Sequence, residues 1–213
     1  MSFRLQTLAS RGFVVASLVA FSLFGYGCGG SNNSATLSAQ FTASTTPPNT
    51  LHLIKLVQKS ASGAFVVVQA VIYGPDVTLD MYSFAFDVKI VDASVVQFVT
   101  GSAIAGNALQ PFVGQTIQAI AGFGTLPGGG VDTSRVVVGV SKLGPVPGNG
   151  IAGSSAVVVE LTFQVLKQGT TTLTLTGNPN PQVLDSNGVA IGTITFDSAS
   201  ASMTGISTGG GGY

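Results

Sequence analysis

The sequence predicts an all-β protein that folds as a single β-sandwich of about nine strands. Short runs of apolar residues alternate with polar residues at a period of two, which is typical of strands with one buried face. Gly- and Pro-rich segments separate these runs. No stretch after residue 30 has a convincing 3.6-residue period, so no helix is expected in the folded part of the chain.

The clearest strand is expected over Met81–Val91. Its apolar side chains, at positions 82, 84, 86, 88 and 90, alternate with polar or small side chains at 83, 85, 87 and 89. The two sets therefore belong to opposite faces of a sheet. The segment Asp92-Ala93-Ser94 interrupts the pattern, and the next strand is expected over Val95–Thr100. Ser155–Leu166 has the same alternation and is the second diagnostic strand.

Shorter patterns predict the other strands. These are expected over Leu51–Val57, Ala64–Tyr73, Gln115–Phe123, Arg135–Leu143, Thr170–Thr176 and Val189–Phe196, with a further edge strand over Ala199–Ile206. The segment Asp185-Ser186-Asn187-Gly188 predicts a hairpin turn, because Asn-Gly adopts positive φ at little cost.

The N-terminus has the pattern of an export signal. Arg4 and Arg11 flank an apolar run, Phe13–Phe24, that is too short to span a bilayer comfortably as a helix. Small residues then lead to Cys28, the only cysteine of the chain. One interpretation is an ordinary cleaved signal peptide with an incidental cysteine. The other, which the position of Cys28 favours, is a bacterial lipoprotein signal, which this segment resembles.

These patterns divide the chain into four segments. We expect a signal peptide of the lipoprotein type over residues 1–27, a tether or linker over 28–50, one β-sandwich over 51–206 and a flexible Gly-rich tail over 207–213. Acyl chains on Cys28 would anchor the protein stably, since a single chain binds membranes only marginally. The protein is therefore expected to be exported and lipid-anchored to a bacterial membrane, at the outer membrane or cell surface.

Composition excludes several functions. Charged residues make up 8% of the chain, against about 25% in typical globular proteins. Lys plus Arg and Asp plus Glu balance at 8 each, so no basic patch is expected for nucleic acid. The single cysteine excludes an internal disulfide.

No pattern predicts catalysis, a metal site or a cofactor. The only histidine, His52, is expected to be a surface residue, and most aspartates fall in turns, where the side chain bonds the backbone. Asp87 and Glu160 differ, because each lies within a strand. They are either ordinary outward-facing residues or part of a binding face. The candidate sheet-face residues for a partner are Ser83, Asp87, Lys89, Glu160, Thr162 and Gln164.

Three stretches resemble, in order, the recurrent stretches of bacterial cohesin modules. They are FAFDVKIVDASVVQFV (84–99), SSAVVVELTFQVLKQGTTTLTL (154–175) and VLDSNGVAI (183–191). The resemblance covers about Leu51 to Gly205. It implies a jelly-roll sandwich of nine strands, related to certain cellulose-binding modules, that binds dockerin modules through one sheet face. The residues that contact dockerins vary between cohesins, so none is transferred to this chain.

The expected function is a non-catalytic extracytoplasmic binding or scaffolding module for a dockerin-type protein. Two alternatives stay open. The related fold binds polysaccharide directly, although Trp is absent and carbohydrate faces usually present aromatic platforms. The third interpretation is a structural surface domain without a dockerin partner. An enzyme is the least expected reading, because no nucleophile–base pair is present.

Overall fold

A computed structural model describes residues 36–47, 52–109, 116–177 and 182–208. Within these ranges every regular element is a strand. The predicted signal peptide, Cys28 and the Gly-rich tail from residue 209 lie outside the described residues. No helix within the described ranges is long and apolar enough to cross a membrane.

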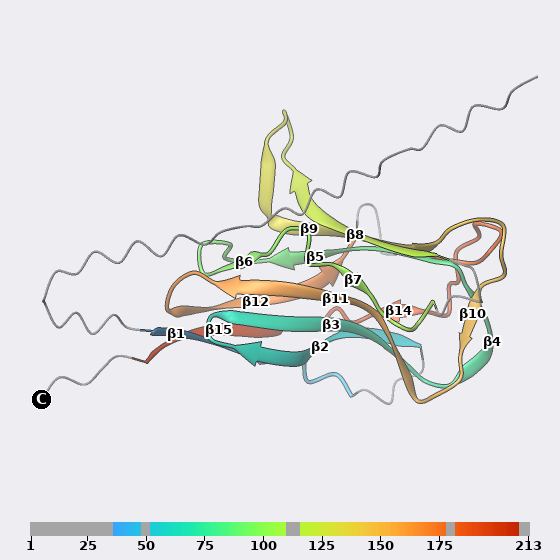
Figure 1. Ribbon diagram of the computed structural model, residues 1–213, viewed down its shortest axis with the longest axis horizontal. Coiled ribbons are helices and arrows are strands. Elements are labelled where there is room, and N and C mark those ends of the chain that lie inside the picture. The colour runs from blue at the N-terminus through green and yellow to red at the C-terminus, as the bar shows by residue number, and fades with distance from the viewer. Residues whose placement is uncertain (1–35, 48–51, 110–115, 178–181, 209–213) are drawn as a thin grey trace, which may run out of the picture. The chain divides into compact units, whose positions relative to one another are not determined.

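Two sheets form the sandwich (Figure 1). We call them sheet A and sheet B. Sheet A has the order β1-β15-β12-β5-β9-β8, with β13 paired to β5. Its strands are β1 (Thr36–Thr42), β5 (Ser83–Ile90), β8 (Ile117–Thr125), β9 (Val131–Lys142), β12 (Gly169–Thr176), β13 (Gln182–Leu184) and β15 (Ala201–Thr208).

Sheet B has the order β14-β2-β3-β11-β6, with β7 paired to β11. Its strands are β2 (Leu53–Ser62), β3 (Phe65–Tyr73), β6 (Val96–Phe98), β7 (Ile104–Ala105), β11 (Ser155–Val165) and β14 (Thr195–Phe196). A separate pair joins β4 (Asp76–Met81) to β10 (Asn149–Ile151). All pairings are antiparallel except that of β14 with β2. The chain passes repeatedly between the sheets, and the predicted all-β sandwich is confirmed.

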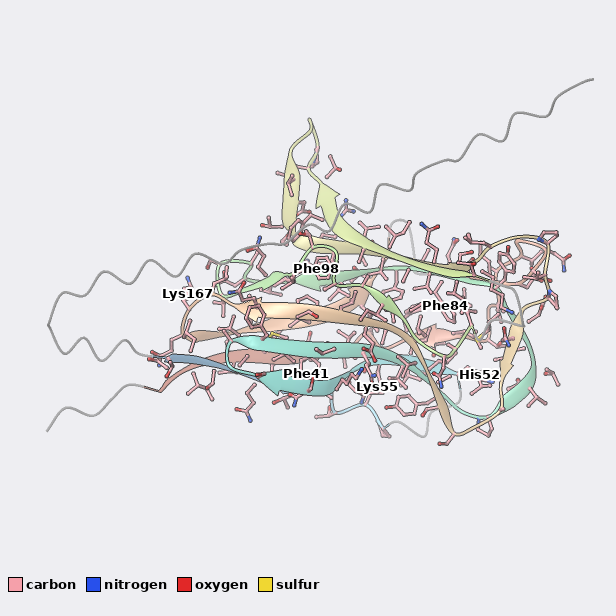
Figure 2. All side chains as sticks on the ribbon, viewed as in Figure 1. Phe41, His52, Lys55, Phe84, Phe98 and Lys167 are labelled. Atoms are coloured by element: carbon pink, nitrogen blue, oxygen red, sulfur yellow. The ribbon has the colours of Figure 1, made fainter. Side chains whose placement is uncertain are left out.

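The core lies between the sheets. In β5 the residues Phe84, Phe86, Val88 and Ile90 are buried, as the period of two predicted. Figure 2 shows Phe84 and Phe98 in the side-chain layer between the strands. The Phe98 ring of sheet B lies 6.1 Å from the Phe123 ring of β8 in sheet A, edge to face. Phe86 of sheet A likewise lies 5.7 Å from Phe196 of sheet B. Such aromatic pairs stabilise beyond their buried area and tie the two sheets together.

The predicted linker over 28–50 contains a strand, and this boundary is wrong. Residues 36–42 form β1, which pairs with β15 from Thr36–Thr208 to Thr42–Ser202. Leu37, Ala39 and Phe41 alternate with polar residues, and Phe41 is buried opposite Met203. Ser and Thr, which made the segment look like a linker, are the outward-facing residues of a strand.

Three other predictions differ from the structure. Most of Val189–Phe196 is irregular, with an isolated bridge from Ala190 to Leu184, and only its last two residues form a strand, β14. Residues 201–208 form β15, which lies between β1 and β12 instead of at an edge. The predicted strands left out residues 76–80, which form most of β4. Each of these depends on pairing between segments distant in sequence, which a local pattern does not contain.

A buried polar cluster fixes the point where the chain crosses from sheet B to sheet A. Asp197, 5% exposed, follows β14 and accepts hydrogen bonds from the Ser44 hydroxyl, the Thr46 hydroxyl at 2.8 Å and the Ala199 amide at 3.0 Å. The buried Lys55 Nζ donates to the carbonyl oxygens of Ser44 at 3.1 Å and Thr46 at 2.6 Å. Residues 44–46 are therefore held from both sides. Figure 2 shows Lys55 on the β2 side of the sandwich.

Phe41→Ala is expected to lower the free energy of unfolding by about 3 kcal/mol, because it leaves a cavity at the buried position of β1. Chemical denaturation of residues 33–213 measures the change. Gln40→Ala, at the exposed neighbouring position, is the control and is expected to be nearly silent. Equal, small effects of both substitutions would mean that β1 behaves as the linker that its composition suggests.

Asp197→Ala is expected to destabilise the protein by about 3 kcal/mol, since it leaves buried hydroxyl and amide donors without an acceptor beside a buried lysine. Asp185→Ala, in an exposed turn, removes a carboxylate that also accepts two backbone bonds. Its expected cost is about 1 kcal/mol. A cost at Asp197 no larger than that at Asp185 in the same denaturation experiment would contradict a central role for the cluster.

Candidate binding surface

The six predicted sheet-face residues all point outward, but from different sheets. Ser83, Asp87 and Lys89 belong to β5 in sheet A. The other three, Glu160, Thr162 and Gln164, belong to β11 in sheet B. Since the inner faces of the two sheets pack together, the two outer faces point in opposite directions. The six residues therefore do not form one surface.

On the outer face of sheet B, Glu160 is already engaged within the sheet. Its two carboxylate oxygens each lie 2.7 Å from Lys59 Nζ, and Gln69 Nε2 donates to it at 2.8 Å. Burial raises the pKa of Glu160, but the hydrogen bonds from Lys59 and Gln69 outweigh burial, and the net pKa lies below its ordinary value. The three residues come from the neighbouring strands β2, β3 and β11. Glu160 thus stabilises the sheet and has little capacity left for a partner.

On the outer face of sheet A, small side chains leave a shallow hollow over β5, β9 and β8. Ala85 pairs with Gly139, and Gly139 pairs with Ile120, so one row across the three strands contains a single large side chain. The hollow has a volume of about 320 Å³. Its lining includes Ser83, Ala85, Gln118, Ile120, Gly139 and Ser141. Ile120 is 59% exposed and Val137, on β9, is 44% exposed. This face therefore combines an apolar centre with polar neighbours.

Charged residues border the hollow on one side. Arg135 Nη1 lies 3.6 Å from Asp87 Oδ2, and Arg135 Nε lies 3.8 Å from Asp132 Oδ2. Lys89 is exposed and lies opposite Arg135 in the ladder between β5 and β9. A Cβ at Gly124 would come within 2.3 Å of Arg135 Nε, so the glycine of β8 makes room for the guanidinium. The arrangement resembles the polar rim of a protein-binding surface.

Burial raises the pKa of Asp87 above its ordinary value, and the positive charge of Arg135 opposes that rise. The pKa of Asp132 is lowered instead, mainly by the hydrogen bond from the Ser134 hydroxyl. The two carboxylates that contact Arg135 thus differ in environment. Asp87 is 5% exposed and is ionised only at the cost of desolvation.

Hydroxyl groups cover the other half of this face. The outward residues of β12 are Thr170, Thr172, Thr174 and Thr176. The hydroxyls of Thr170 and Thr204 lie 2.9 Å apart, as do those of Thr174 and Ser200. These pairs link β12 to β15 and the residue that precedes it. The result is an uncharged polar surface beside the hollow, which suits a chain with few charges.

A second hollow, of about 300 Å³, lies near β10 and the start of β11. Its lining includes Asn107, Asn149 and Ser155, and it is more polar than the first. The buried Oδ1 atom of Asn149 has no hydrogen-bond partner within the described structure. Amides and hydroxyls of this kind also hydrogen-bond sugar hydroxyls.

The described residues show no metal centre. They contain no group of three His, Cys, Asp or Glu side chains placed to hold a metal ion.

The prediction that His52 is a surface residue is wrong. It is 6% exposed, has a φ of 55°, and its Nε2 lies 3.2 Å from Asp76 Oδ2. Its amide donates to the Tyr73 carbonyl and its carbonyl accepts from the Thr195 amide, which fixes the start of β2.

The interpretation of the aspartates as residues in or beside turns holds for Asp92 and Asp185, whereas Asp76 and Asp132 lie at the starts of strands β4 and β9. Asp76, Asp92, Asp132 and Asp185 each accept a hydrogen bond from the backbone amide two residues later.

Exposed aromatic side chains are scarce among the described residues. Tyr82 donates its hydroxyl to the Gly144 carbonyl at 2.6 Å, and Phe65, at 45% exposure, is the one phenylalanine of the described chain that is largely exposed.

The comparisons with known proteins concern the fold. Neither a protein-family model nor a curated protein matches the sequence. Among solved structures, the chain is similar to the type II cohesin dyad from the adaptor ScaA scaffoldin of Acetivibrio cellulolyticus, with 15% identity and a TM-score of 0.49. This match covers 70% of the present chain and 47% of the dyad, so the chain spans about half of that protein.

Two further similar structures come from the same organism. A type II cohesin domain from its cellulosome has 14% identity and a TM-score of 0.47, over 78% of the present chain and 94% of that domain. The sixth cohesin of its scaffoldin B, in complex with a mutant Cel5 dockerin, has 17% identity and a TM-score of 0.45, over 75% and 96%. All three of these structures contain cohesin modules.

Replacement of Arg135 tests the electrostatics of this face. Arg135→Gln is expected to raise the pKa of Asp87 further, because it removes the charge that opposes the effect of burial. Titration of the carboxyl signals by NMR measures the shift. Asp92, whose pKa is lowered chiefly by the Ser94 hydroxyl, is the internal control and should not move. An unchanged Asp87 would show that Arg135 does not act on it.

The raised pKa of Asp87 also determines whether the stability of the fold rises or falls with pH. A folded state that holds the Asp87 proton more tightly than the unfolded chain loses stability as the pH rises from 3.8 through the pKa of folded Asp87. This loss should be larger in Arg135→Gln and absent in Asp87→Asn, when each is compared with the unaltered protein over the same pH range.

Proposed function

We propose that the protein is a non-catalytic binding module that takes a dockerin-type protein onto the outer face of sheet A. The observation that carries this proposal is the hollow over Ala85, Gly139 and Ile120, with an apolar centre and the charged border of Asp87, Arg135 and Lys89. Protein-binding surfaces commonly have an apolar centre within a polar rim.

The partner class rests on the resemblance of the three sequence stretches to cohesins, whose partners are dockerins. Dockerins carry paired calcium loops, and calcium is held there by oxygen ligands of the partner. Binding should therefore depend on calcium although this chain has no calcium site of its own among the described residues. We further propose that a lipid anchor at Cys28 presents the module outside the cytoplasm, so that the partner is displayed at the membrane surface.

The test uses residues 33–213, which contain the whole described sandwich. The immobilised module is incubated with lysate of the source organism, with and without a calcium chelator. Proteins retained only with calcium are identified, and the binding of a purified partner is measured by calorimetry. Retention of no protein under either condition would contradict the proposal.

Gly139→Arg is expected to weaken partner binding by about tenfold or more, because the long side chain fills the hollow at its centre. The substitution should leave the fold intact, since a Cβ at Gly139 meets nothing within 4 Å. Thr162→Arg places the same side chain on the outer face of sheet B and is the matched control. If Thr162→Arg abolishes binding and Gly139→Arg does not, the partner uses the opposite face.

Direct polysaccharide binding is the second candidate, and the polar hollow at Asn107, Asn149 and Ser155 favours it. Asn149→Ala should then reduce retention on insoluble polysaccharide, whereas Gly139→Arg should not. Retention that neither substitution changes would exclude both hollows as the carbohydrate site.

A further inference from the structure

Strand β8 is a long, unprotected edge of sheet A. Its sequence, IQAIAGFGT, contains no charged residue and no proline. Proteins usually protect edge strands with charges, proline, short strands or a covering segment, because the free amide and carbonyl groups of an edge recruit further strands. Within the described chain, β8 hydrogen-bonds in a ladder only to β9.

The other edges of the sandwich are protected. At the opposite edge of sheet A, the amide of Ala39 in β1 donates to the Gly63 carbonyl at 2.8 Å, and that of Phe41 donates to Gln58 Oε1 at 3.3 Å. These bonds occupy outward amides of β1. The outermost strands of sheet B have two or three residues each. Most of β2 extends beyond its two-residue pairing with β14, but β2 carries Lys55 and Lys59. Among the described strands, β8 is thus the longest sheet edge without a charged residue.

The inner side of β8 is incompletely buried. Its inward residues Ile117, Ala119, Ala121 and Phe123 pack against the core but stay only partly buried. Its outward residue Ile120 is 59% exposed. A further strand beside β8 would cover both sets, so burial of apolar surface favours an apolar partner strand here.

The sequence of β8 is complementary to itself. The regular ladder with β9 runs from Ile117 to Phe123, where the register shifts, and its midpoint is Ile120. Antiparallel pairing of two such segments about Ile120 places Ile117 opposite Phe123 and Ile120 opposite its own copy. Aromatic and β-branched cross-strand pairs stabilise sheets, and no like charges face each other. The same residues meet on both sides, as a two-fold interface requires.

We propose that β8 pairs with β8 of a second copy of this chain, antiparallel about a two-fold axis at Ile120. The pairing joins two copies of sheet A into one continuous sheet. It uses the edge of the sheet and does not depend on which partner binds the face.

Cysteine cross-linking of the full chain in cells tests the pairing. Residues directly opposite each other in such a pair have Cβ atoms about 4.5–5.5 Å apart, close to the reach of a disulfide. Ile120→Cys is therefore expected to give a covalent dimer of twice the chain mass after oxidation. Val137→Cys is the matched control, because Val137 is exposed on the same face but lies on the inner strand β9. Cys28 is common to both variants and to the unaltered chain.

Several outcomes would overturn the proposal. They are absence of the Ile120→Cys dimer, equal cross-linking of Val137→Cys, and cross-linking of Ile120→Cys to a different protein.

A second experiment measures the mass of the detergent-solubilised full chain by light scattering. Ile120→Lys sets two positive charges opposite each other and should weaken the dimer by about tenfold or more, whereas Val137→Lys should not. An unaltered chain that stays monomeric at every concentration overturns the pairing outright.

Discussion

The sandwich depends on how the chain crosses from sheet B to sheet A after Phe196. β14 pairs parallel to β2, and only five residues later β15 begins between β12 and β1. Asp197 stands at this crossing, where its amide donates to the Ile54 carbonyl and its carboxylate holds residues 44 and 46. Lys55 holds the same residues from β2. The hydrogen bonds of Asp197 and Lys55 offset the desolvation of these side chains and hold residues 44–46, just after β1, beside the start of β15.

A scarcity of charge shapes both outer faces. Charged residues make up 8% of the chain, and the outer face of sheet A is covered largely by Thr hydroxyls and by Gly and Ala on β8. The few charges that do lie on the faces pair within the sheet, as Glu160 does with Lys59. Asp87 also pairs within its sheet, with Arg135 at 3.6 Å, but burial still raises the pKa of Asp87. A partner that brought a cation to this site would relieve that cost, which gives the sheet A face a chemical preference that sheet B lacks.

The sequence predicted the strands whose apolar residues alternate strongly, such as Phe84 to Ile90 and Leu161 to Val165, because burial on one face dictates that period. The alternation also predicted that Asp87 and Glu160 point outward. It did not predict that they lie in different sheets, because strand order depends on contacts between residues far apart in sequence. β1 was missed because Phe41 is its one large buried residue among Ser and Thr. The strand predicted over 189–196 was too long because residues 189–194 form an isolated bridge, between Ala190 and Leu184, and no ladder.

The small residues of β8 and β9 connect the two proposals. Gly139 has no side chain and so leaves space for the hollow on the face. In β8, Ala119, Ala121 and Gly122 have small side chains or none, so little side-chain bulk projects from the edge strand. Hydrogen bonds to an edge lie in the plane of the sheet, whereas side chains project perpendicular to it, so a second copy at β8 leaves the face of sheet A open. A two-fold axis through facing Ile120 residues runs perpendicular to the sheet and turns both outer faces to the same side. A dimer would thus present two hollows side by side, and a bivalent partner would gain avidity without any new contact.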